Sequence, residues 1–127
     1  TEGLVQPPEM YEAMGRYNQQ LVDAGILLAA EGLSTSRDAA RVTYDNGKLT
    51  VKDGPFTESK ELIAGFWIIQ VKSKDEAVEW VKRIPFTETA TIEVRRVAEA
   101  SDFEGVMSPE TIAAEEAMRD AIAGKAS

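Results

Sequence analysis

Asp53-Gly54-Pro55-Phe56 is the stretch of sequence that decides how this chain folds. Proline presets the backbone angle φ and glycine permits unusual backbone conformations, so the chain must turn sharply here. Directly before it, residues 41–44 and 49–51 alternate with a period of two around Asn46-Gly47, and Asn-Gly is the strongest short hairpin signal because both residues tolerate positive φ. The sequence therefore predicts a β-hairpin whose second strand ends at the turn.

The other elements follow from the spacing of apolar residues and from capping signals. Helical stripes that end at Gly25 and Pro85 predict two helices, and an N-cap followed by proline at Ser108-Pro109 predicts a third. The run 62–69 is apolar at odd and even positions, so a strand there needs cover on both faces of its sheet. Outside the hairpin we predict a helix over 8–24, a strand over 26–30, a strand over 62–69, a helix over 73–83, a strand over 91–97 and a C-terminal helix after 108.

Length and composition place the chain among ordinary globular proteins. Its 127 residues suffice for one hydrophobic core, and 43% hydrophobic and 28% charged residues are typical of a folded domain. The net charge of −8 would repel a polyanion, so we expect no nucleic-acid partner. The longest charge-free apolar run, 62–71, is about half the length of a bilayer-spanning helix, and the N-terminus has no signal-peptide pattern. These features predict a cytoplasmic protein without a membrane partner.

The chain contains neither cysteine nor histidine. This composition excludes disulfides, Cys/His zinc sites, thiol nucleophiles and imidazole acid–base catalysis. Any proton transfer must therefore use Asp, Glu, Lys or Tyr. Since the sequence also has no glycine-rich phosphate loop and no nucleotide fingerprint, we expect no cofactor.

Two carboxylates are the candidates for catalysis. Asp53 lies in the turn beside a glycine and an aromatic residue, where loss of water contact would suit a general base; the alternative is a turn-forming Asp that caps its own backbone. Glu31 closes an apolar strand and either faces a pocket or is merely exposed where the strand stops. A hard-cation site made by Glu31, Asp53 and Glu61 is conceivable, but its spacing is generic and we predict no metal site.

Four residues in or after the turn are candidates for binding a substrate. Lys60 and Glu61 supply a cation and a carboxylate for the polar groups of a ligand, or else form a solvated charged loop. Phe56 and Trp67 offer apolar walls, whereas the alternative for such aromatic residues is plain core or interface. Together these residues predict a pocket for a small polar molecule.

The order of elements around the turn resembles the YCII-related family, whose DGPF members are named after this tetrapeptide. The resemblance covers roughly residues 8–97. It implies an α+β, ferredoxin-like βαββαβ fold that dimerises through its sheets into an α/β barrel, here with an inserted β-hairpin and a C-terminal helix. The segments that carry the resemblance are 24–33, 51–56, Glu58, 60–61, 63–66, Ala77, Trp80 and 92–95.

The sequence departs from the family at its beginning. Family members start with a strand before the first helix, and Thr1 to Pro7 offers only Leu4-Val5 for it. That strand lies at the centre of the family sheet, so we expect an upstream segment to supply it. We expect a YCII-related domain over residues 1–103 and a helical tail over residues 104–127.

The resemblance also directs the functional hypotheses. Some catalytic members of the wider family rely on a His-Asp pair, so in this histidine-free chain Asp53 would act without that partner. We expect a homodimer that binds a small polar metabolite in a pocket near its interface, with carboxylate acid–base chemistry of lyase or isomerase type. The alternative is a non-catalytic regulatory or protein-interaction module, and the sequence is compatible with both.

Overall fold

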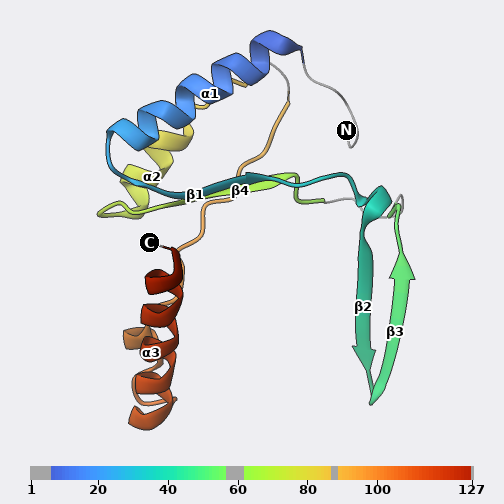
Figure 1. Cartoon of the computed structure of the whole chain (residues 1–127), viewed down its shortest axis with the longest axis vertical. Coiled ribbons are helices and arrows are strands. Elements are labelled where there is room, and N and C mark those ends of the chain that lie inside the picture. The colour runs from blue at the N-terminus through green and yellow to red at the C-terminus, as the bar shows by residue number, and fades with distance from the viewer. Residues whose placement is uncertain (1–6, 57–61, 87–88, 127) are drawn as a thin grey trace. The chain divides into compact units, whose positions relative to one another are not determined.

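The computed structural model describes residues 7–56, 62–86 and 89–126 (Figure 1). The chain divides into two units, residues 1–94 and 95–127. The mixture of helices and antiparallel strands confirms the predicted α+β class. The first unit contains α1 (Pro8–Asp23), β1 (Leu27–Gly32), the short 3-10 helix η1 (Ser36–Asp38), β2 (Ala40–Asp45), β3 (Lys48–Asp53), β4 (Gly65–Ile69) and α2 (Lys74–Val81), and the second contains the 3-10 helix η2 (Ala100–Phe103) and α3 (Pro109–Ala126).

The helices of the first unit begin and end at capping residues. α1 has Pro8 in its first turn and is followed by Gly25, whose φ of 75° suits a residue without a side chain. At the start of α2, the backbone N–H of Glu76 donates to Oγ of Ser73 (3.1 Å), and the Glu76 carboxylate accepts from the backbone N–H of Lys72 (2.9 Å). Both predicted helices are therefore confirmed.

β1 and β4 pair antiparallel in a two-stranded sheet, and α1 and α2 lie on the same side of it (Figure 1). The core forms between these helices and one face of the sheet, and its most deeply buried side chain, Leu21, is only 1% exposed. This arrangement covers one face of the sheet. The buried core residues are Tyr17, Leu21 and Ile84, and Met14, Ile26, Leu27, Trp67, Ile69, Trp80, Val81 and Ile92 pack partly buried against them.

The Tyr17 hydroxyl ties α1 to α2. It donates a hydrogen bond to the backbone oxygen of Trp80 (2.8 Å), and burial raises the pKa of this hydroxyl. Tyr17→Phe keeps the ring but removes this long-range hydrogen bond, leaving the Trp80 carbonyl with only the backbone N–H donors of its own chain segment, such as Arg83 (3.1 Å), so we expect the free energy of unfolding to fall by about 1 kcal/mol. Urea denaturation measures the loss. Tyr11→Phe, at a 59% exposed position of the same helix, is the control, and an equal loss in both variants would contradict this role for Tyr17.

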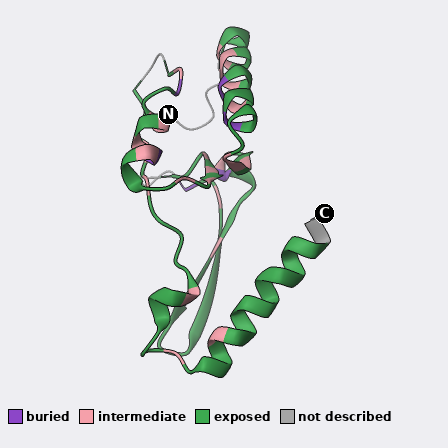
Figure 2. Ribbon diagram, turned by 90° about the vertical axis from the view of Figure 1, so that its left-hand side faces the viewer, coloured by how far each residue is buried: buried purple, intermediate pink, exposed green. Residues whose placement is uncertain are grey.

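β2 and β3 form an antiparallel hairpin around Asn46-Gly47, where both residues have positive φ (49° and 83°). The register pairs Val42 with Val51 and Tyr44 with Leu49. Because side chains alternate between the two faces of a strand, these four side chains share one face. They are between 65% and 71% exposed (Figure 2). The hairpin therefore has an uncovered apolar face.

The strand predicted over residues 91–97 is wrong, because this stretch forms no strand in the structure. The alternation behind that prediction is real, since Ile92 and Val94 are half-buried between exposed neighbours and Ile92 packs against the core. A strand also needs a partner, however, and within the described residues β4 pairs with β1 alone. Leu4-Val5, the candidate for the first family strand, lie outside the described residues, so that expectation stays a prediction.

The second unit consists of η2, α3 and the segments beside them. The Arg96 guanidinium (2.7 Å) and the backbone N–H of Glu99 (2.7 Å) bind the Asp102 carboxylate and hold its pKa below the usual range. The N–H of Thr111 donates to Oγ of Ser108 (3.2 Å) at the start of α3, which confirms the predicted C-terminal helix. α3 is exposed along nearly its whole length (Figure 2). Among the described residues, no helix combines the length and the apolar character needed to cross a membrane.

Candidate functional site

The turn at residues 53–56 packs against η1 through its backbone. The Gly54 N–H donates to the carbonyl oxygen of Ala39 (2.8 Å), and the Gly54–Pro55 peptide bond is cis. A Cβ atom added to Gly54 would lie 1.6 Å from the carbonyl oxygen of Ser36. Glycine is therefore required here by the close approach of two backbone segments.

Phe56 anchors the other end of the turn. Its side chain is 4% exposed, and its backbone N–H donates to Oγ of Ser36 (3.0 Å), which is itself 6% exposed. The guanidinium carbon of Arg41 lies 4.0 Å from the centroid of the Phe56 ring, in a cation–π contact. The ring that the sequence proposes as a ligand wall is thus packed within the chain.

Asp53 is the last residue of β3 and lies opposite Ala40 of β2. It is exposed, and the alternation of the strand places it on the same face as Leu49 and Val51. The first candidate carboxylate therefore lies at the end of the hairpin's apolar face.

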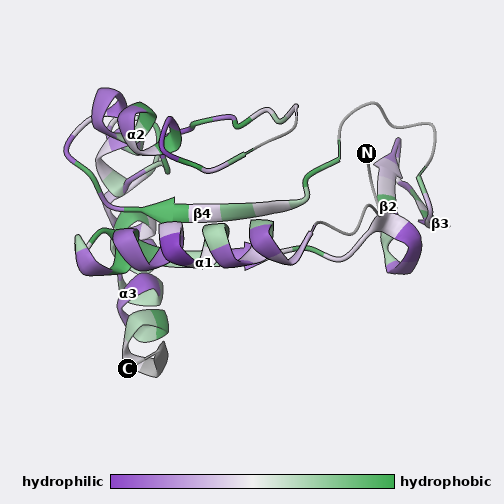
Figure 3. Cartoon of the chain, turned by 90° about the horizontal axis from the view of Figure 1, so that it is seen from above, coloured by the Kyte–Doolittle hydropathy of each residue, from purple (hydrophilic) through white to green (hydrophobic). Residues whose placement is uncertain are grey.

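Glu31 pairs with Phe66 across the β1–β4 sheet. Residues directly opposite each other share a face, and the next residue along β4, Trp67, packs into the core, so Glu31 and Phe66 lie on the face away from the helices. Ile68 lies on the same face, opposite Ala29, and a β-bulge between Leu27 and Ala29 leaves Leu28 without a partner in the register. Phe66, Ile68 and Leu28 are 42%, 39% and 61% exposed. β4, which carries the first two, is hydrophobic along much of its length (Figure 3). The second candidate carboxylate lies on an uncovered apolar face.

Trp67 belongs to the opposite, covered face. Its indole N–H donates to Oδ1 of Asn18 (2.8 Å), and its ring meets that of Tyr17 edge to face, with the centroids 6.2 Å apart and the planes at 88°. A buried indole needs such an acceptor, and nothing in the sequence pointed to Asn18. Trp67 thus joins β4 to α1 within the core.

A single copy of the chain presents its two candidate carboxylates separately. Within residues 7–56, 62–86 and 89–126, no hydrogen bond or ion pair links Asp53 to Glu31, and no group of three or more acidic side chains is placed to hold a metal ion. Lys60 and Glu61, the proposed ligand-binding pair, lie outside the described residues. Asp53 and Glu31 therefore lie on two different apolar faces, Asp53 on the hairpin and Glu31 on the β1–β4 sheet.

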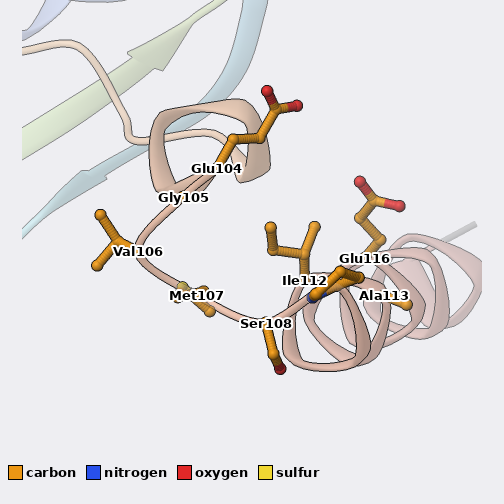
Figure 4. Close-up of a pocket in the computed structure, with 9 residues that line it drawn as sticks. Glu104, Gly105, Val106, Met107, Ser108, Ile112, Ala113 and Glu116 are labelled. Atoms are coloured by element: carbon orange, nitrogen blue, oxygen red, sulfur yellow. The ribbon is translucent and has the colours of Figure 1, made fainter.

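The second unit contains a hollow that the sequence did not predict. It has a volume of about 760 Å³ and lies between the 104–108 loop and the first turns of α3 (Figure 4). Val106 and Ile112 supply apolar walls, with the carboxylates of Glu104 and Glu116 beside them. Val106 is 82% exposed, so the hollow is open to solvent. In the sequence, this region shows an apolar pair, Val106-Met107, directly before the N-cap Ser108. Such a pair is ordinary before a helix and does not indicate a hollow.

Comparison with known proteins places the chain in a family. The chain matches the model of the YCII-related domain over residues 4–101, a span that includes both candidate carboxylates and the turn. It is 34% identical over 82 residues to an uncharacterized protein of Rhizobium meliloti (strain 1021). That match covers 63% of this chain and 66% of the relative, just under two thirds of its length. Since the family model matches well over half of the sequence, the chain belongs to the YCII-related domain family.

Proposed function

We propose that the protein is a homodimer that binds a small polar metabolite in a pocket beside the dimer interface. Glu31 and Asp53 perform acid–base chemistry of the lyase or isomerase type in this pocket. The observation that carries the proposal is the position of Glu31, which lies opposite Phe66 on the sheet face that α1 and α2 of its own unit leave uncovered.

The exposed sheet face supports the dimer. An antiparallel sheet commonly packs one face on the core and solvates the other with polar residues, but here Phe66, Ile68 and Leu28 face outwards. A contiguous apolar patch of this kind marks an interaction site. In a two-fold dimer the same patch serves both copies, and pairing through the sheets is the arrangement that the family resemblance implies.

Covering this face changes the chemistry available to Glu31. A dimer interface would enclose the carboxylate together with a bound metabolite. A carboxyl group within hydrogen-bond reach of the reacting atom can then take up or release a proton there. Asp53 is the second group of the pair, since two carboxyl groups in different environments divide the roles of acid and base between them. The mechanism needs no histidine.

Four other residues complete the proposed pocket. Lys60 and Glu61, in the segment that follows the turn, hold polar groups of the metabolite. Phe56 and Trp67 support the pocket from behind, because both side chains pack within the chain and Trp67 lies on the covered face of the sheet. A few polar groups among apolar supports are typical of small-molecule sites.

Glu31→Gln tests the carboxylate. We expect this variant to remain dimeric and to lose turnover at least about 100-fold, because an amide of the same shape cannot transfer a proton. Ligand-observed NMR with a mixture of small polar metabolites follows both binding and conversion. Glu12→Gln, an exposed acid on α1, is the matched control. Equal conversion by both variants and the unaltered protein would exclude Glu31 as a catalytic group.

A non-catalytic regulatory or protein-interaction module is the alternative function. It is favoured by α3, on which Met118 and Ile122, one turn apart, are 54% and 68% exposed. An exposed apolar stripe on a helix is a common docking element for another protein. In the NMR experiment, a metabolite that binds without being converted would favour this alternative over the enzyme.

A further inference from the structure

The β2–β3 hairpin is an amphipathic ribbon whose apolar face is not covered by the described residues of its own unit. Two-stranded ribbons are marginally stable in water unless they pack on something else. The four apolar side chains of this face are nevertheless 65% to 71% exposed. The cross-strand register places Val42, Tyr44, Leu49 and Val51 on this face, and Arg41, Thr43, Asp45, Lys48, Thr50 and Lys52 on the other.

The uncovered face of the β1–β4 sheet matches the hairpin face in length and in chemistry. β1, β2 and β3 have six residues each and β4 has five, so both faces are about 17–20 Å long. Each face is apolar and bears one carboxylate, Asp53 on the hairpin and Glu31 on the sheet. Two apolar faces of equal length are suited to pack against each other.

We propose that the hairpin of one copy lies across the uncovered β1–β4 face of a second copy, so that each site combines Glu31 of one copy with Asp53 of the other. This inference rests on the proposed homodimer and specifies which element of the second copy covers the sheet. It explains why the two carboxylates are separate in a single chain, because neither copy alone contains a complete pair.

The distribution of charge favours a second copy as the occupant. Within residues 40–53, Arg41, Lys48 and Lys52 outnumber Asp45 and Asp53, which gives one net positive charge. The whole chain carries −8, so the remainder carries −9. Two hairpins packed on each other would bring like charges together, whereas a hairpin on the body of a second copy brings opposite charges together.

The apolar area also fits a dimer in which both faces are used. Taking roughly 100 Å² for each exposed apolar side chain, the hairpin face alone supplies about 400 Å² and both faces together about 700 Å² per copy. A stable interface buries about 800 Å² on each partner. If the two copies exchange hairpins about a two-fold axis, each copy buries both its hairpin face and its sheet face, and the buried area approaches about 800 Å² per copy. A contact between the two hairpin faces alone would bury only about half of that area.

The proposed contact assembles the acid–base pair. It brings Glu31 of one copy and Asp53 of the other to the two sides of one enclosed contact. One carboxyl group can then donate a proton to a bound molecule while the other accepts one from it. The site is therefore complete only in the dimer.

Disulfide trapping between single-cysteine variants tests the contact, and the chain suits it because it has no cysteine of its own. Val51→Cys, on the hairpin, is mixed with isotope-labelled Phe66→Cys, on the sheet, under mild oxidation. The experiment is repeated with isotope-labelled Ile68→Cys as a second sheet variant. We expect mixed disulfide dimers, because side chains interdigitate across two packed faces and bring the sulfur atoms of opposing cysteines within bonding reach. Thr50→Cys, one residue along on the polar face, is the matched control and should give at least about tenfold less product.

Mass spectrometry of the trapped species and sedimentation of the unaltered protein separate the outcomes. Val51→Cys trapped only with itself would show hairpin-to-hairpin packing and overturn the inference. A dimer that yields no mixed disulfide with either sheet variant would also overturn it, while the proposed homodimer stands. A monomer in sedimentation would overturn the inference and the proposed function together.

Discussion

Gly54→Ala is expected to lower the free energy of unfolding by about 3 kcal/mol or more. The added Cβ would lie 1.6 Å from the carbonyl oxygen of Ser36 and 2.7 Å from its carbonyl carbon. Both atoms belong to the backbone of η1, so no side-chain rotation relieves the clash. The turn must move away from η1, which breaks the Gly54 hydrogen bond to Ala39 and uncovers Phe56. Urea denaturation followed by far-UV circular dichroism measures the loss.

Gly15→Ala is the matched control for this prediction, because it makes the same chemical change in the middle of α1. Among the described residues, a Cβ added to Gly15 would meet no atom within 4 Å outside the backbone of α1 and the two neighbouring residues. Alanine is the better helix former, so this variant should gain about 0.5–1 kcal/mol of stability. The two substitutions thus have opposite expected signs. If Gly54→Ala were as stable as the unaltered protein, the turn would not be packed on η1 as the structure shows.

The turn illustrates what a sequence reveals about a fold and what it conceals. Gly54-Pro55 predicts a sharp turn from backbone geometry alone, and Asn46-Gly47 likewise predicts the hairpin, because both signals are local. The reason for glycine at position 54 is not local. It lies in the approach of Ser36, a buried serine whose neighbours in the sequence have no distinguishing pattern.

The stretch 91–97 shows the same limit for a strand. The alternation of Ile92 and Val94 correctly indicates which side chains turn towards the core. Alternation, however, describes one strand, and a sheet needs the edge of a second strand at the right place. No periodicity within residues 91–97 contains that information, so the pattern identifies the side chains that turn inwards but does not establish a strand.

The candidate site was also only partly predictable from the sequence. The sequence singled out Glu31 and Trp67 from their positions in apolar strands, but only the register of β1 and β4 shows that they lie on opposite faces of one sheet. Because the run 62–69 is apolar throughout, its sequence does not tell the covered face from the uncovered one. The structure therefore moves Trp67 to the core and leaves Glu31 as the carboxylate on the open face.

The two faces of β4 are separated most sharply by the substitutions Ile68→Asp and Ile69→Asp. The residues are adjacent, so the cost of placing Asp in a strand is common to both variants. Ile69 packs against the core, and a carboxylate there should lower the free energy of unfolding by about 3 kcal/mol or more. Ile68 is 39% exposed on the other face, so Ile68→Asp should leave the single chain folded, with a loss within about 1 kcal/mol.

Ile68→Asp should act on the proposed dimer instead. Covering the open face would bury an unpaired carboxylate beside Glu31, and short Asp has no long stem with which to reach water. We expect the dimer dissociation constant to rise at least about 100-fold, equivalent to about 2.7 kcal/mol. Analytical ultracentrifugation over a range of concentrations measures this shift, and circular dichroism verifies the fold. An unchanged dissociation constant would mean that the open face of β1 and β4 faces water in solution, and the interface would then have to lie elsewhere on the chain.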